Sequence, residues 1–226
     1  DRRLGCRQLG MNLPQRVTTG SIQETYSGQN AALHGTHCWT VYFERCYVNG
    51  CATDKILPRR YASVEFNRRL ARLLGEAAAV NCVVGRANLE KTVMFDDGDE
   101  VIVLDAAGMP DHLIVADHTG SFAQYELPLV SDAQAYAVPV NKRARHLANA
   151  NEFATFYVDA FQDRFVRIQQ EYRRRKRAFD SLFKHRPLDK AGSIAYRWLC
   201  TLERLNSTDA AALAQAIRSH IVVLNS

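Results

Sequence analysis

Residues 92–116 read TVMFDDGDEVIVLDAAGMPDHLIVA, and this stretch decides the fold class. Apolar, β-branched runs at 100–105 and 112–116 predict two short strands. The Gly and Pro residues between them, within 106–111, predict a tight turn. A further short strand at 92–95 precedes the pair, separated from it by an acidic turn at 96–99. We therefore expect a small β-sheet built around a hairpin.

Helical periodicity flanks this hairpin on both sides. A helix is predicted from Ser63 as its N-cap, with apolar residues at three- and four-residue steps. After the hairpin, a long amphipathic helix is predicted over 152–185, ended by Pro187. Two more helices are expected, one around 191–205 and one after a Thr208 cap.

The remaining segments give weaker signals. Residues 1–35 are polar and predict irregular loops, whereas the aromatic and β-branched run 37–48 predicts a strand that ends in a turn at 49–50. Pro128 and Pro139 predict a loop before the helical half. The order of elements predicts the α+β class: a small mixed or antiparallel sheet with a hairpin, then a mainly helical C-terminal half.

Length and composition suit a single domain over residues 1–226. Its expected parts are an irregular and β part at 1–60, a helix plus hairpin at 61–130, and a helical part at 140–226. The chain has 47% hydrophobic residues, which excludes a disordered protein, and has no apolar run long enough for a membrane span. It begins without Met, as a piece of a longer chain would.

The six cysteines form no C-x-x-C pair, so we expect reduced thiols and a cytoplasmic location. Zinc-capable residues occur at His34, His37, Cys38, Cys46 and Cys51, but their spacing is not that of a zinc site, and buried thiols are the favoured interpretation.

The stretch 84–122 carries the residues of greatest chemical interest. A predicted helix leads to Gly-Arg-Ala-Asn at 85–88, and the hairpin leads to Asp-His-Thr-Gly-Ser-Phe at 117–122. Over about 71–130 this layout resembles the C-terminal lobe of atypical kinases, the phosphoinositide-kinase, HipA-like and actin-fragmin kinase group. Residues 117–122 look like the metal-binding aspartate after a strand, and the segment from 85 to 95 looks like the catalytic loop and its strand.

This resemblance implies a kinase-like phosphotransferase domain, or a non-catalytic relative, with Mg²⁺ and ATP as cofactors. Asp117 would hold the metal, Thr92 would lie in the cofactor site, Asn88 would lie near the transferred phosphoryl group, and Arg86 would support the loop. The chain departs from the family pattern: Asn88 stands where an Asp is expected and Thr92 where an Asn is expected. No Gly-rich loop or strand lysine can be assigned upstream.

An ordinary hairpin with acidic turns explains the same stretch without any cofactor. Asp96, Asp97, Asp99 and Glu100 lack the spacing of a calcium loop, and Asp and Gly residues are typical of a solvated turn.

The strongest local charge signal is a run of five basic residues, Arg173, Arg174, Arg175, Lys176 and Arg177. It lies in a segment, 142–186, with twelve Lys and Arg against five Asp and Glu, although the whole chain has a net charge of only +5. Five consecutive helical positions surround the helix, so we expect at least one to face the apolar side unless its charged end extends past that side to water. The alternative function is therefore a non-catalytic module whose basic helix binds nucleic acid or an acidic protein. A solvated helix face with internal ion pairs explains much of the same pattern.

Overall fold

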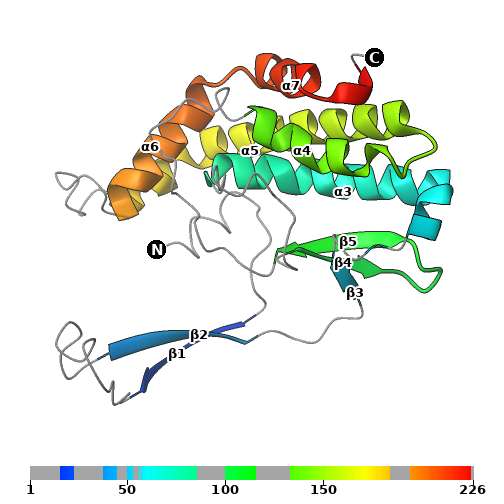
Figure 1. Cartoon of the computed structure of the whole chain (residues 1–226). Coiled ribbons are helices and arrows are strands. Elements are labelled where there is room, and N and C mark those ends of the chain that lie inside the picture. The colour runs from blue at the N-terminus through cyan, green and yellow to red at the C-terminus, as the bar shows by residue number, and fades with distance from the viewer. Residues whose placement is uncertain are drawn as a thin grey trace, which may run out of the picture. The chain divides into compact units, whose positions relative to one another are not determined.

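The computed structural model describes residues 16–22, 38–44, 50–52, 56, 58–85, 100–115, 133–183 and 194–224. The chain divides into two compact units, Leu13–Val48 and the remainder, Asp1–Asn12 with Asn49–Ser226. The predicted α+β class is confirmed, because small antiparallel sheets precede a helical C-terminal half (Figure 1). The expectation of a single domain over 1–226 stays a prediction.

The smaller unit contains a two-stranded antiparallel sheet. Strand β1 (Arg16–Ile22) pairs with β2 (Cys38–Glu44), from Arg16 opposite Glu44 to Ile22 opposite Cys38. The prediction of irregular loops over 1–35 is therefore wrong at β1. Its β-branched residues at 17, 18, 19 and 22 suit a strand, but the polar residues among them hide that signal until β2 supplies the pairing.

The larger unit contains the hairpin predicted from the sequence. Strand β4 (Glu100–Leu104) is central, with β3 (Gly50–Ala52) on one side and β5 (Pro110–Val115) on the other, all antiparallel. Gly50, expected in a turn, instead begins β3. The strand expected at 92–95 lies outside the described residues.

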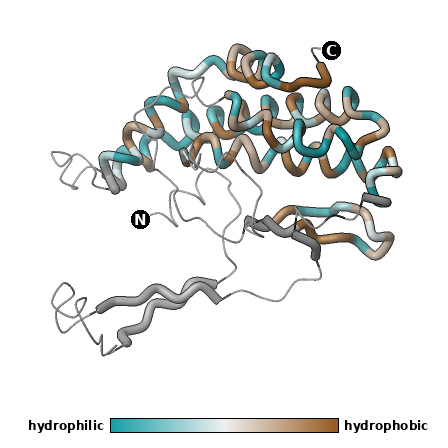
Figure 2. The backbone as a smooth tube through the Cα atoms, viewed as in Figure 1, coloured by the Kyte–Doolittle hydropathy of each residue, from teal (hydrophilic) through white to brown (hydrophobic). Residues whose placement is uncertain are grey.

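Helices form most of the described part of the larger unit. Helix α3 (Val64–Val83) follows the 3₁₀ turn η2 (Pro58–Ala62), and the expected Ser63 cap is confirmed, since its hydroxyl accepts from the Phe66 amide at 3.2 Å. The long helix α5 (Ala150–Phe183) matches the predicted one closely. Colours alternate between hydrophobic and hydrophilic along the helices, as amphipathic elements require (Figure 2).

Three further helices complete the unit: α4 (Ala133–Ala144), α6 (Ile194–Ser207) and α7 (Ala210–Ser219), with η4 (Val222–Leu224) after them. Pro139 lies inside α4, so the predicted loop there is wrong. Burial of Tyr136, Ala137 and Val140 against α5 and α7 favours the helix despite the missing proline N–H. The cap of α7 is Asp209 and not Thr208, because the Asp209 carboxylate accepts from two amides of the first turn.

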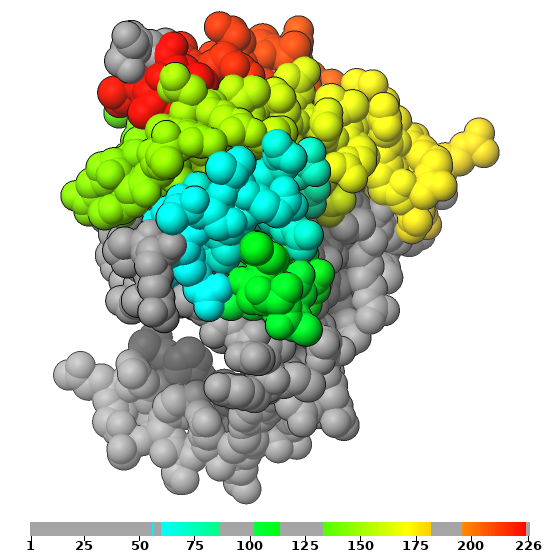
Figure 3. Space-filling view, turned by 90° about the vertical axis from the view of Figure 1, so that its right-hand side faces the viewer, coloured from blue at the N-terminus to red at the C-terminus, as the bar shows by residue number. Residues whose placement is uncertain are grey.

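The core lies where α3 packs along α5. The backbone of α3 lies close to that of α5 at Gly75, where an added Cβ would lie 2.2 Å from the Tyr157 carbonyl oxygen. The Tyr157 hydroxyl is fully buried and donates to the Tyr136 carbonyl at 2.6 Å, and burial raises its pKa. On the surface that Figure 3 shows, α3 lies between the hairpin and α4 and α5. None of the described helices is long and apolar enough to cross a membrane.

Candidate functional site

The β4–β5 hairpin has an open end. One segment of chemical interest leads into β4 there, and another follows β5. Glu100, the first residue of β4, pairs with Val115, the last residue of β5. The segment before Glu100 and the segment after Val115 therefore meet the sheet at adjacent positions. These are the segments that carry the residues of the kinase-like interpretation.

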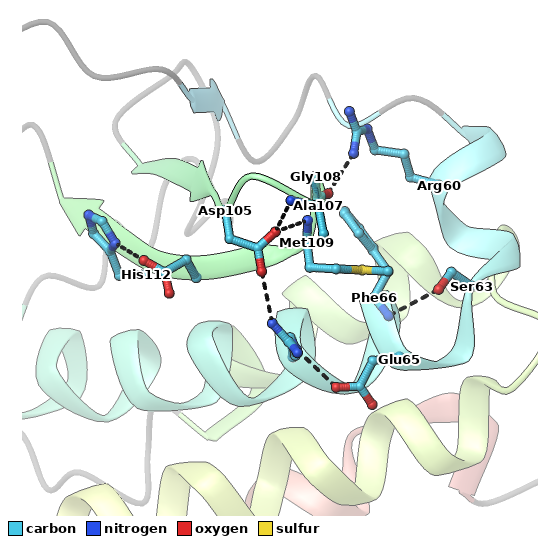
Figure 4. Close-up of polar contacts among 11 residues, drawn as sticks. Arg60, Ser63, Glu65, Phe66, Asp105, Ala107, Gly108, Met109 and His112 are labelled. Carbon is cyan, nitrogen blue, oxygen red and sulfur yellow. Dashed lines mark hydrogen bonds and ion pairs between the residues drawn. The ribbon is translucent and has the colours of Figure 1, made fainter.

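The other end of the hairpin is a turn held by Asp105. Its Oδ1 accepts from the amides of Ala107 and Met109 at 2.9 Å each (Figure 4). Gly108 adopts φ of 74°, a left-handed conformation that glycine tolerates best. Its carbonyl accepts from Arg60 Nη1 at 2.8 Å, which ties this turn to η2.

A side chain from the beginning of α3 also holds this turn. Arg69 donates to Asp105 Oδ2 at 3.2 Å and to Glu65 Oε1 at 2.9 Å. The hydrogen bond from Arg69 lowers the pKa of Glu65, and the same bond raises the pKa of Arg69. Because the turn is tied to the N-terminal part of α3, and β5 packs along α3, the open end points toward the C-terminal part of that helix (Figure 1).

Helix α3 ends just before the predicted loop. The Val84 amide bonds to Val80, and Gly85 takes φ of 62°, which ends the helix in a left-handed residue. One turn earlier, Asn81 is buried, and its Nδ2 donates to no atom of the described chain. Sequence reasoning did not single out Asn81. The available signal was a polar residue among Ala77, Ala78 and Cys82 on the apolar face.

Four predicted site residues lie outside the described residues. Arg86, Asn88 and Thr92 belong to the segment between Gly85 and Glu100, and Asp117 is the second residue after Val115. The structure thus defines the three ends from which these segments depart, at Gly85, Glu100 and Val115. Their donor set, a carboxylate, an amide and a hydroxyl, consists of hard oxygen ligands of the kind that Mg²⁺ prefers.

The basic run lies on α5, where all of residues 173–178 are exposed. The expectation that at least one basic side chain faces the apolar side unless it snorkels is consistent with this, because every one of the five side chains extends to water. Tyr172 and Phe179 bracket the run and their rings meet edge to face at 5.5 Å. These two aromatic residues cover the packed side, so the charged heads between them reach water.

Two carboxylates neutralise part of the run. Glu171 pairs with Arg174 and with Arg175, and Asp180 pairs with Lys176 at 2.8 Å. The hydrogen bond from Arg174 lowers the pKa of Glu171, and the one to Asp180 raises the pKa of Lys176. Within the described part of the chain, Arg173 donates to a neutral partner, Asn206 Oδ1, at 3.3 Å. Residues 171–180 therefore keep five cations against two anions.

The larger unit has a hairpin on a helical layer, and the described residues of the chain contain no cluster of three His, Cys, Asp or Glu side chains able to hold a metal ion. Comparison with family models, with curated proteins and with solved structures finds no match to this chain.

Proposed function

We propose that the open end of the β4–β5 hairpin binds magnesium and a nucleotide, as a kinase-like phosphotransferase domain or a non-catalytic relative would. The observation that carries this proposal is the pairing of Glu100 with Val115. It supports a site shared by the two segments, because residues flanking paired strand ends start from adjacent positions.

Each predicted residue has a chemical role in this proposal. Asp117 supplies the charged oxygen ligand to Mg²⁺. Thr92 lies in the cofactor site, and Asn88 lies near the transferred phosphoryl group. Arg86 supports its loop next to the phosphates, where a guanidinium suits the charge and shape of a phosphate group. When bound, Mg²⁺ neutralises charge on the nucleotide phosphates.

The residue at position 88 bears on whether the domain is catalytic. A carboxylate accepts a proton from an attacking hydroxyl, but an amide does not act as such a base. The presence of Asn88 therefore supports the binding half of the proposal more strongly than the transfer half.

Nucleotide binding is tested by thermal unfolding with and without Mg-ATP. At ten times the dissociation constant, ligand should stabilise the fold by roughly 1.4 kcal/mol, which raises the midpoint by about 4 °C for a chain of this size. We expect Asp117→Ala to abolish this shift. Asp111→Ala is the matched control, since Asp111 is an exposed carboxylate on β5 that pairs with the neighbouring His112.

The comparison of the two variants decides the outcome. A shift that survives in Asp117→Ala, or no shift in the unmodified protein at millimolar Mg-ATP, contradicts the proposal. Loss of the shift in both variants contradicts the assignment of the metal to Asp117, because the control removes the same charge at a position that the proposal does not use.

A further inference from the structure

The basic run on α5 has two kinds of side chain, which differ in position around the helix. At 100° per residue, Arg175 and Lys176 lie within about 50° of the direction of Tyr172 and Phe179, the packed side. By the same geometry, Arg173, Arg174 and Arg177 lie roughly 110° or more from it. We call these three arginines the outward strip.

The pairing of charges follows the same division in part, because one of the three outward arginines also has a carboxylate partner. Arg175 and Lys176 are each paired with a carboxylate of α5, Glu171 and Asp180. In the outward strip, Arg174 shares Glu171 with Arg175, and Arg173 has the neutral partner Asn206. Arg177 is exposed and has no ion-pair partner within the described ranges. The uncompensated charge of this helix end therefore lies on the side facing water.

The C-terminal end of the neighbouring helix adds no net charge to this surface. The end of α6 carries Glu203 and Arg204, which are of opposite sign, followed by the neutral Asn206 and Ser207. Exposed pairs such as Glu171 with Arg174 contribute little to stability, so a polyanion can compete for the guanidinium at low cost. The Arg174 side chain is 69% exposed, which leaves it accessible to a ligand.

We propose that the outward strip binds the phosphate backbone of nucleic acid. Guanidinium groups bind phosphate through two parallel hydrogen bonds, and three of them spread over two turns of the helix suit a repeating phosphate chain. A protein partner is less well matched, because protein interfaces centre on buried aromatic or aliphatic anchors. The exposed large hydrophobic residues of the described chain are Val64 and Val222, and neither belongs to α5.

Because its contacts are restricted to phosphates, this binding should have two properties. It is independent of base sequence, since phosphate contacts position a protein without reading bases. It weakens steeply with salt, because each neutralised phosphate releases counterions and contributes about −0.9 to the slope of log K against log salt. This surface belongs to α5 and not to the hairpin, so the inference does not depend on nucleotide binding.

The test compares two double variants with the same change of charge. The probe is a fluorescent duplex DNA, titrated with the full chain at several salt concentrations. We expect Arg173→Gln with Arg177→Gln to flatten the slope by about 1.8, from the loss of two phosphate contacts. The control, Arg175→Gln with Lys176→Gln, should keep the slope of the unmodified protein.

Three results overturn the inference. One is no binding to the duplex at low salt, and another is an equal loss of slope in both double variants. The third is equally tight binding to polyglutamate, which would mark the surface as a site for acidic proteins. Far-ultraviolet circular dichroism of both variants checks that α5 still forms, so that a loss of binding can be attributed to the missing charges.

Discussion

Replacing Gly75 with alanine should lower the free energy of unfolding by about 3 kcal/mol, although alanine is the better helix former. The new Cβ would lie 2.2 Å from the Tyr157 carbonyl oxygen and 3.1 Å from both the Ala160 Cβ and the Phe161 amide nitrogen. Two of these three atoms are backbone, so no side-chain rotation relieves the overlap. Helices α3 and α5 would have to separate, and packing along both would be lost.

The control for this variant is Glu76→Ala, on the next position of α3. Glu76 forms an ion pair with Arg167 at 3.4 Å, and both side chains are more than two-fifths exposed. Its loss should change stability by less than about 1 kcal/mol. Urea unfolding measures both variants. A Gly75→Ala protein as stable as the original would mean that the helices do not approach this closely.

Truncating Phe161 to alanine should have the largest effect in the core, lowering the free energy of unfolding by about 3–5 kcal/mol. Phe161 is fully buried on α5, and its ring lies 6.0 Å from both Tyr136 on α4 and Phe165 on the next turn. Removal of the ring leaves a cavity between three helices, and the aromatic contacts with both neighbours are lost.

A conservative variant separates the effect of the cavity from the effect of substitution itself. Phe161→Leu keeps most of the volume and should cost less than about 1.5 kcal/mol. The same urea experiment compares the two. A loss below about 1 kcal/mol in Phe161→Ala would show that this ring is not at the centre of the helical core.

Local periodicity explains which parts of the fold were predictable. The apolar spacing that predicts a helix over 152–185 is a property of neighbouring residues, and α5 spans Ala150–Phe183. The hairpin at Glu100–Val115 carries its own turn signals as well. Strand β1 was missed because its stability depends on β2, and Pro139 was misassigned because burial on α5 and α7 outweighs local propensity.

For the candidate sites, too, some properties could be predicted from the sequence and others could not. The sequence indicated which residue types could carry chemistry at Asp117 and in the basic run, but not which atoms meet. The adjacency of Glu100 and Val115 depends on strand register, and the partial neutralisation by Glu171 and Asp180 depends on side-chain positions around a helix. Both depend on the three-dimensional structure and cannot be predicted from the number of charged residues in the sequence.

The most direct test of the hairpin site is paramagnetic broadening of backbone amide signals by Mn²⁺-ATP. Mn²⁺ takes the same oxygen ligands as Mg²⁺ and broadens nearby resonances. We expect broadening at Glu100 and Val115, the paired open end, and loss of that broadening in Asp117→Ala. Gly108, in the turn at the other end of the hairpin, should stay sharp. Equal broadening at Gly108, or none at Glu100 and Val115, would contradict the proposal.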